Sequence, residues 1–426
     1  MNLELIEEKL KDEFKKIEKQ EEANSIKILN AFREEKVSET DFNSTTGYGY
    51  NDLGRDKLER VFSRVLGSED ALVRSQFISG SHALTVTLFA LLRPGDTLLS
   101  ISSKPYDTLD EVIGIRENKS SLKSFNINYK QVDLIDNDFD YEKIKDVITS
   151  EKIKVIEIQR SKGYSTRASL NIEKISSVIK FIKDIDKDII IMVDNCYCEL
   201  VEDKTPCEVG ADIIVGSLIK NLGGAIAPNG AYVAGRHDLI ELVAERLTLP
   251  GEGREVGPSL GINRSLYQGL FMAPSVVAAS LKTAVLTAYL AEKMGYKVEP
   301  RYNANRADIV QSIIFENKED LIKYCQGIQK YSPIDSFSTC YPAPMPGYDD
   351  EVIMASGSFT NGSSIELSCD GPIRFPFIAY QQGSISYQYG KIAVYNAFKE
   401  LKWFNHFFCS TKIIPYIECS KLREDI

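Results

Sequence analysis

Short apolar runs that alternate with helix-like segments constrain the fold of this chain most. The runs "TLLSIS", "KVIEIQ", "IIIMVDN", "DIIVGS" and "GAYVAGR" read as strands, and "IEKISSVIKFIKDI" has the apolar periodicity of a helix. Unbroken apolar strands separated by helices indicate a parallel or mostly parallel sheet that helices cover on both faces. The sequence therefore predicts an α/β fold around such a sheet.

The length of the chain, 426 residues, is too great for one ordinary core and predicts two domains. Residues 1–45 read as an N-terminal helical arm, because apolar residues recur there at three- and four-residue steps (Leu3, Ile6, Leu10 and Phe14). Residues 46–290 contain the predicted sheet and form the large domain. Residues 291–426 mix strands, turns and helices, as we expect of a smaller α+β domain.

Composition and charge exclude several classes of protein. A formal net charge of −10 argues against a nucleic-acid-binding surface. No segment approaches the roughly 18 consecutive apolar residues of a membrane span, and the charged N-terminus resembles neither a signal peptide nor a transit peptide. Eight cysteines without a repeated spacing and only three histidines predict reduced thiols and no metal site. We therefore expect a cytoplasmic protein.

Polar residues that directly follow the apolar runs are the candidates for a functional site, because ligands of open α/β sheets bind beyond the carboxyl ends of the strands. Lys220 lies at such a place. There a lysine is partly desolvated, which lowers its pKa, and the neutral amine forms Schiff bases with aldehydes. The alternative is a surface lysine that caps a turn. Four further places have this character: Gly80-Ser81-His82, Tyr106, Gln159-Arg160-Ser161 and Asp194-Asn195.

Asp194 makes the chemical interpretation of Lys220 more specific. It either caps the following turn or, if buried, needs a cationic partner such as the protonated pyridine nitrogen of pyridoxal 5'-phosphate (PLP). The glycine turn at Gly80 and Ser81 joins a strand to a helix, which suits a phosphate, and Ser217 offers a hydroxyl to the same anion. Tyr106 is either an ordinary half-buried tyrosine or a ring that lies on a pyridine face.

The order of these features resembles that of fold-type-I PLP enzymes of the Cys/Met metabolism group, which includes methionine γ-lyase and the cystathionine lyases. Within it, the chain resembles a bacterial family known for aluminium resistance or methionine γ-lyase similarity. The resemblance covers about residues 40 to 400. It is carried by "GYGYNDLGRDKLE", "ALVRSQFISGSHAL", "IQRSKGYSTRASL", "VDNCYCELVE", "GSLIKNLGGAIAPNGAYVAG" and "YQGLFMAPSVVAASLK".

The resemblance implies a carbon–sulfur lyase that acts by β- or γ-elimination on a sulfur-containing amino acid and releases a thiol, a 2-keto acid and ammonia. Lys220 would hold PLP as an internal aldimine and then act on the Cα proton. Asp194 would pair with the pyridine nitrogen, while Tyr106 would stack on the ring and serve as the candidate general acid. The phosphate would be held by Gly80, Ser81, His82 and Ser217.

The resemblance also implies a homo-oligomer, a dimer or tetramer, in which Tyr50 or Tyr48 of the partner subunit reaches the phosphate. Arg374 would grip the substrate α-carboxylate. The group's Asn-Pro contact to the ring oxygen is replaced here by "IQRSKGY", so Arg160 or Ser161 could take over that role.

The departures from the group's pattern surround the substrate and leave the reaction open. A PLP enzyme of other specificity, namely a transaminase, a racemase or a β/γ-replacement enzyme, has the same cofactor residues. A PLP-fold protein of stress or metal tolerance with little catalysis is a further alternative, although the sequence has no carboxylate cluster typical of a hard-cation site.

Overall fold

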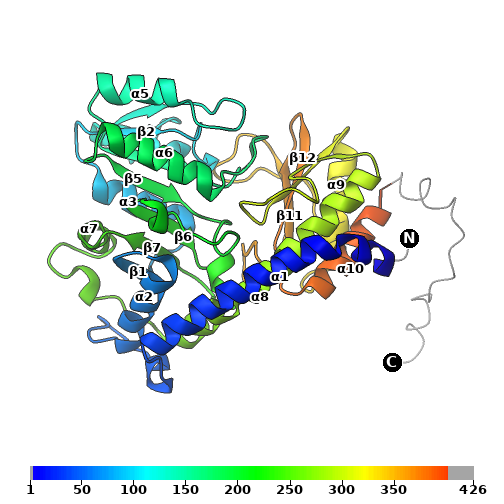
Figure 1. The fold of residues 1–426 in the computed structure, drawn as a ribbon, viewed down its shortest axis with the longest axis horizontal. Coiled ribbons are helices and arrows are strands. Elements are labelled where there is room, and N and C mark those ends of the chain that lie inside the picture. The colour runs from blue at the N-terminus through cyan, green and yellow to red at the C-terminus, as the bar shows by residue number, and fades with distance from the viewer. Residues whose placement is uncertain (1–2, 402–426) are drawn as a thin grey trace, which may run out of the picture.

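Two separate sheets, joined by one long helix, make up the structure, a computed structural model that describes residues 3–401. Residues 402–426, the end of the predicted C-terminal domain, lie outside the described residues. The long helix is α8 (Asn263–Lys293). Helix α1 (Leu3–Glu34) lies along α8 and reaches from the large sheet to the small domain (Figure 1).

The large sheet has seven strands in the order β1-β7-β6-β5-β4-β2-β3, and only β7 runs antiparallel to its neighbours. The predicted α/β fold with a mostly parallel sheet is therefore confirmed. We did not predict β3, because its four residues are not apolar and lie half-exposed at the sheet edge. The strands are β1 (Asp70–Arg74), β2 (Thr97–Ser100), β3 (Asn128–Gln131), β4 (Val155–Gln159), β5 (Ile190–Asp194), β6 (Ile213–Ser217) and β7 (Ala231–Gly235).

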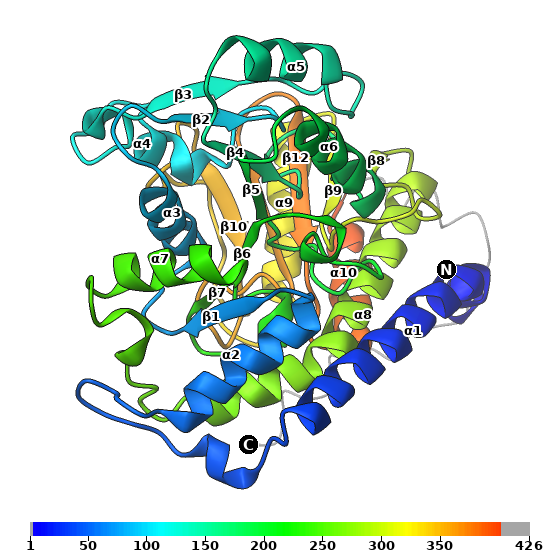
Figure 2. The same cartoon turned by 60° about the vertical axis from the view of Figure 1, so that its left-hand side comes forward.

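Helices cover both faces of this sheet, which explains why its central strands are buried at every position and mostly apolar. Ile156 and Ile158 pack into the core on the side of α2, α5 and α6, whereas Val155 packs into the core on the side of α3 and α7. Figure 2 shows α3 and α7 on one side of β5 and β6 and α6 on the other. The helices are α2 (Leu53–Leu66), α3 (Gly80–Leu91), α4 (Asp110–Ile113), α5 (Tyr141–Ser150), α6 (Ile172–Ile185) and α7 (His237–Leu247).

The smaller domain is built on an antiparallel sheet in the order β10-β11-β12-β9-β8. One face of the sheet shares a core with α8, α9 and α10, and the face with Ile378 and Tyr380 contacts Tyr164 and Tyr197 of the large domain. The elements are β8 (Lys297–Glu299), β9 (Gln311–Phe315), β10 (Val352–Ala355), β11 (Ser368–Pro372), β12 (Phe377–Gln382), α9 (Lys318–Lys330) and α10 (Tyr387–Lys399).

Helix α8 is the most apolar long helix of the described residues. Within residues 3–401 it is the one helix that is long and apolar enough, by length and composition, to cross a membrane. However, 78% of its most apolar stretch is buried inside the protein, where it contacts α1 and α10. The apolar character of α8 is therefore accounted for by its position in the core.

The loop that follows Lys220 packs directly on the backbone of α8. This loop is the 3-10 turn η5 (Asn221–Gly223), followed by Gly224 in the left-handed region with φ +53°. A Cβ on Gly224 would lie 2.2 Å from the carbonyl oxygen of Gly269 in α8, and a Cβ on Gly269 would lie 2.3 Å from that of Gly223. Only glycine allows so close an approach of two backbones, so this contact fixes where the loop lies.

We predict that Gly269→Ala destabilises the protein, although alanine is favoured over glycine in a helix by about 1 kcal/mol. The added methyl group would overlap the Gly223 carbonyl, and overpacking of this kind costs about 1–3 kcal/mol. Chemical denaturation would measure the change, with Gln268→Ala, an exposed neighbour on α8, as the control. A Gly269→Ala protein more stable than wild type would contradict the backbone contact.

Candidate active site

Four of the predicted places meet at the carboxyl edge of the large sheet. Lys220 follows β6, Asp194 ends β5, Tyr106 follows β2, and Gly80 begins α3. The Lys220 Nζ atom lies 4.0 Å from the ring centroid of Tyr197, which follows β5 three residues after Asp194. The sheet therefore brings an amine, a carboxylate and a helix N-terminus to one site.

The pKa of Lys220 lies above that of an ordinary lysine, opposite to the expected direction. Burial lowers this pKa, but the surrounding acidic groups raise it by more, namely Cys196, Tyr197, Asp194 and Glu199. The structure thus places Lys220 at the end of the strand but surrounds its amine with a thiol, a phenol and two carboxyl groups, which together favour its protonated form.

Asp194 is a buried carboxylate with no cation at ion-pair distance within residues 3–401. Its Oδ1 atom accepts the backbone N–H of Cys196 at 3.0 Å. A buried carboxylate without a cationic partner is unfavourable, so this arrangement fits a ligand that brings a positive charge. Glu157 projects from β4 on the same face, and burial raises the pKa of its carboxyl to about 7, which keeps much of it neutral.

The N-terminus of α3 lies against the end of β6. A Cβ on Gly80 would lie 3.2 Å from the Cβ of Ser217, and the described residues offer no acceptor for the amides of Gly80 and Ser81. Two free N–H groups at a helix N-terminus beside a buried serine fit a phosphate group. The Ser81 hydroxyl is held 2.8 Å from that of Thr108, which joins this turn to the Tyr106 loop.

His82 does not contribute its ring to this anion site, contrary to expectation. Its backbone N–H donates to the Ser79 hydroxyl at 3.0 Å, and its Nδ1 atom accepts the N–H of Ile78 at 3.2 Å. The imidazole also packs edge-on against Phe77. The backbone N–H and the Nδ1 atom of His82 are therefore both engaged within the turn that begins α3.

Tyr106 is buried among other tyrosines. Its hydroxyl forms a short hydrogen bond with that of Tyr348 from the small domain, and its ring lies 6.3 Å from that of Tyr164, centroid to centroid. Burial and the neighbouring Tyr348 raise the pKa of Tyr106 well above its usual value. The phenol therefore retains its proton and can donate it.

Arg160 and Ser161 bind other residues of the chain, so the structure gives no support to the substrate-binding role, or to the contact with the ring oxygen, predicted for them. Arg160 is buried with Asn195, whose Oδ1 accepts from its Nη1 at 2.7 Å, and it forms an ion pair with Glu202 at 2.5 Å. The Ser161 hydroxyl donates to Asp308 at 2.8 Å. Arg160 lies two residues after Ile158, which packs on the opposite face of the sheet from Glu157.

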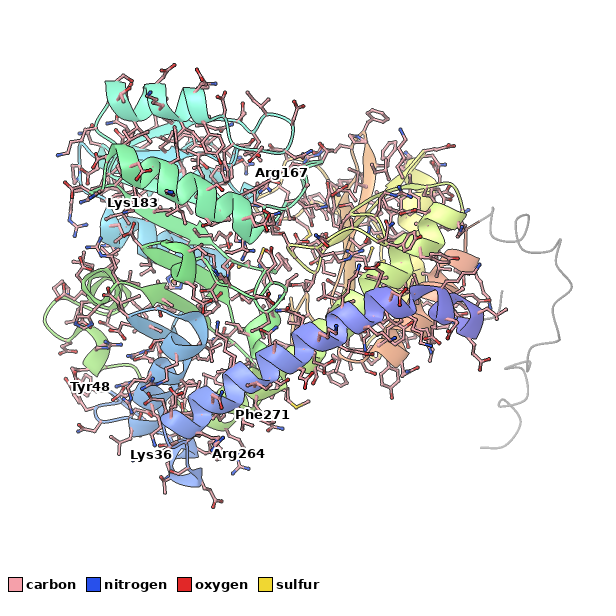
Figure 3. The ribbon with its side chains drawn as sticks, viewed as in Figure 1. Lys36, Tyr48, Arg167, Lys183, Arg264 and Phe271 are labelled. Atoms are coloured by element: carbon pink, nitrogen blue, oxygen red, sulfur yellow. The ribbon has the colours of Figure 1, made fainter. Side chains whose placement is uncertain are left out.

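The three remaining predicted residues lie at the surface. Arg374 forms an exposed ion pair with Asp350 at 3.0 Å. Tyr48 and Tyr50 are 73% and 50% exposed and lie on a loop that the Arg55 guanidinium holds through the carbonyls of Gly49 and Gly257. Figure 3 shows Tyr48 at the end of the large domain away from the small one, whereas Arg167 lies on the side that faces it.

Several residues around the site were not identified from the sequence. Cys196, Tyr197 and Glu199 follow β5, and their clustering with Lys220 requires the fold; the Glu199 carboxyl accepts the Tyr232 hydroxyl at 2.8 Å. Arg167 donates to backbone carbonyls at the end of β4 and so fixes that strand end. Tyr164 lies within the quoted segment "IQRSKGYSTRASL" but was given no role there. Three other residues come from the small domain, and no local motif marked them: Tyr348, Asp370 and Tyr380.

Known proteins share this sequence and fold. The protein YnbB of Bacillus subtilis, which is uncharacterized, is 50% identical over 390 residues, 91% of this chain and 92% of that protein. A carbon-sulfur lyase involved in aluminum resistance from Clostridium novyi is 50% identical, covers 93% of this chain and 94% of its own, and superposes with a TM-score of 0.89.

A more distant structure shares the fold alone. The pyridoxal-5'-phosphate dependent protein YhfS from Escherichia coli is 16% identical, with a TM-score of 0.59 over 90% of this chain and 97% of its own. The model of the methionine gamma-lyase family matches residues 2–402. The chain therefore belongs to the methionine gamma-lyase family, with the fold of type-I PLP enzymes.

Proposed function

We propose that this protein is a PLP-dependent carbon–sulfur lyase that eliminates a thiol from the β or γ carbon of an amino acid. The observation that carries the proposal is Lys220 at the end of β6, beside the buried Asp194 carboxylate that lacks a cation. The free amides at Gly80 and Ser81 support a phosphate at the same site. Family membership and the name of the Clostridium novyi relative support lyase chemistry.

The residues of the site have separate roles in this proposal. Asp194 would accept the pyridine N–H, and the α3 N-terminus with the Ser217 hydroxyl would bind the phosphate. When bound, PLP supplies an electron sink for negative charge at the substrate Cα. Lys220 would attach to the aldehyde and, once displaced by the substrate amine, would move the Cα proton. A cation at Asp194 would offset one of the charges that raise the pKa of Lys220, which favours its basic form.

Departure of the sulfur requires a proton if a thiol is to leave. Tyr106 is the proposed donor, because burial keeps its phenol protonated and the hydroxyl of Tyr348 can return a proton to it. General acid catalysis of this kind contributes about 10²- to 10⁴-fold to a rate. Hydrolysis of the remaining enamine would then give the 2-keto acid and ammonia.

The active protein is proposed to be a homo-oligomer whose sites are shared between subunits. Tyr48 and Tyr50 are exposed side by side, with ring centroids 5.8 Å apart. Leu53 is also exposed, as is Leu260, whose N–H donates to the Thr45 carbonyl near the same loop. Burial of these apolar groups against a second copy would stabilise an assembly. A cytoplasmic location is proposed because Cys325 and Cys369 are free although their sulfur atoms lie 3.7 Å apart, as in a reducing compartment.

A metal-tolerance function gains no support from the one acidic cluster with metal-like spacing in residues 3–401. Its potential ligand atoms, on Asp70, His237 and Glu241, lie within 4.8 Å of one another. The Arg254 guanidinium already pairs with Asp70 at 2.6 Å and with Glu241 at 3.1 Å.

A second buried lysine, Lys162, is an alternative attachment site for the cofactor, so a direct test of Lys220 has to distinguish the two. Lys162 follows β4, and burial lowers the pKa of its amine to about 8, as an activated amine requires. We predict that PLP added to wild type or Lys162→Ala gives a visible absorption band and, after borohydride, a modified peptide that contains Lys220. Lys220→Ala should give neither signal. A modified Lys162 peptide, or no adduct in wild type, would refute the assignment.

We predict that Tyr106→Phe slows keto-acid release from an S-alkyl cysteine by about 10²-fold or more, because the leaving thiolate loses its proton donor. β-Chloro-alanine provides the matched comparison, since chloride leaves without a proton. Its turnover should fall much less. Equal losses with both substrates would show that Tyr106 only positions the ring.

Sharing of sites predicts complementation between two inactive variants. Co-expressed Lys220→Ala and Tyr50→Ala chains should form mixed oligomers with some intact sites and measurable lyase activity, while each variant alone is much weaker. Tyr48→Ala in place of Tyr50→Ala identifies which tyrosine crosses between subunits. Absence of activity with either pairing, in oligomers shown to be mixed, would contradict a shared site.

A further inference from the structure

Asp370 belongs to the small domain and lies on the face of its sheet that contacts the large domain, which carries Lys220. The proposed chemistry does not use Asp370. It lies on β11, paired with Tyr380 of β12, on the sheet face that contacts the large domain. The residue is buried, with only 8% of its surface exposed. Gln382 donates to Oδ2 at 3.1 Å, whereas Oδ1 has no hydrogen-bond partner within the described residues.

Tyrosines surround this carboxyl and connect it to the site. The ring of Tyr164 is tilted against those of Tyr380 and Tyr348, with centroid distances of 5.1 Å and 5.4 Å, and the Tyr348 hydroxyl is hydrogen-bonded to that of Tyr106. The negative charge of Asp370 contributes to the raised pKa of each of these tyrosines and of Tyr197, the residue under Lys220. Asp370 is therefore close to the proposed leaving-group donor.

No cation compensates Asp370 in residues 3–401, since the nearby Arg374 pairs with Asp350. Burial raises the pKa of Asp370 to about 6, an effect that the hydrogen bond from Gln382 partly offsets. Near neutral pH the carboxyl is thus largely charged. A buried, unpaired acceptor costs free energy unless a donor from outside completes it, and tyrosine faces attract cations. The surface formed by Asp370 and the tyrosines around it is therefore suited to bind an ammonium group.

We propose that Asp370 determines substrate specificity by binding a positively charged group at the far end of the sulfur-linked side chain. The preferred substrates would then be thioether amino acids that carry a second ammonium group, rather than those that end in an alkyl group. This inference rests on the proposed function, because it assumes that the α-amino end of the substrate is held at Lys220.

The test compares two substrates of matched length, S-(2-aminoethyl)-L-cysteine and S-propyl-L-cysteine. We expect wild type to favour the aminoethyl compound in kcat/KM by about 10-fold or more, as one charge-assisted hydrogen bond provides. Asp370→Asn should reduce this ratio by about the same factor, and Asp370→Glu should restore part of it. Asp349→Asn, which removes an 80% exposed carboxylate paired with Arg116, should leave the ratio unaltered.

A binding measurement separates failure of this inference from failure of the proposed reaction. Calorimetric titration of both compounds into Lys220→Ala and into the Lys220→Ala, Asp370→Asn double variant reports affinity without turnover. Preference for the aminoethyl compound that Asp370→Asn removes supports the inference even if wild type is not a lyase. No preference in wild-type kinetics and in binding, or an equal loss for both compounds in Asp370→Asn, would overturn it.

Discussion

The contact between Gly223, Gly224 and Gly269 controls the geometry of the whole site. The chain leaves β6, presents Lys220 and must then pass α8 at backbone distance, so no side chain can be accommodated on either surface. Because α8 also packs against the small domain, the same helix that fixes Lys220 supports the sheet that carries Asp370. Helix α8 therefore sets the position of Lys220 relative to Asp370.

Buried carboxyl groups dominate the electrostatics around Lys220. Burial raises the pKa of both Glu157 and Glu199 to about 7, so these groups can reduce the cost of burial by taking up protons. Asp194 accepts a backbone N–H instead and faces no ion-pair partner in the described part of the chain. An excess of acidic groups over cations is unfavourable for the isolated subunit, and it becomes favourable when a positively charged ligand is bound.

The sequence was sufficient for the large sheet and for residues at strand ends, because unbroken apolar runs can be recognised locally and the carboxyl-edge rule applies directly to the residues that follow them. Asp194 and Lys220 were found in this way. The role predicted for Arg160 gains no support, because a position next to a strand end does not specify the face of the sheet on which the side chain lies. The phosphate contact predicted for His82 gains none from its backbone N–H, which donates to the Ser79 cap. Asp370 and Tyr348 could not be found, since they join the site only when the small domain packs against the large one.

The division of the site between two domains explains why family membership does not by itself determine the substrate. Residues proposed for cofactor chemistry lie on the large sheet, whereas Asp370 and Tyr380 lie on the small one, so the two sets can vary independently. A methyl thioether such as that of methionine would leave the Asp370 carboxyl buried and unpaired at the end of the side chain. In the proposed specificity, the Asp370 carboxyl would therefore favour a cationic side chain and disfavour an apolar one. Selectivity would arise from the cost of leaving this carboxyl desolvated and unpaired as much as from its attraction to a cation.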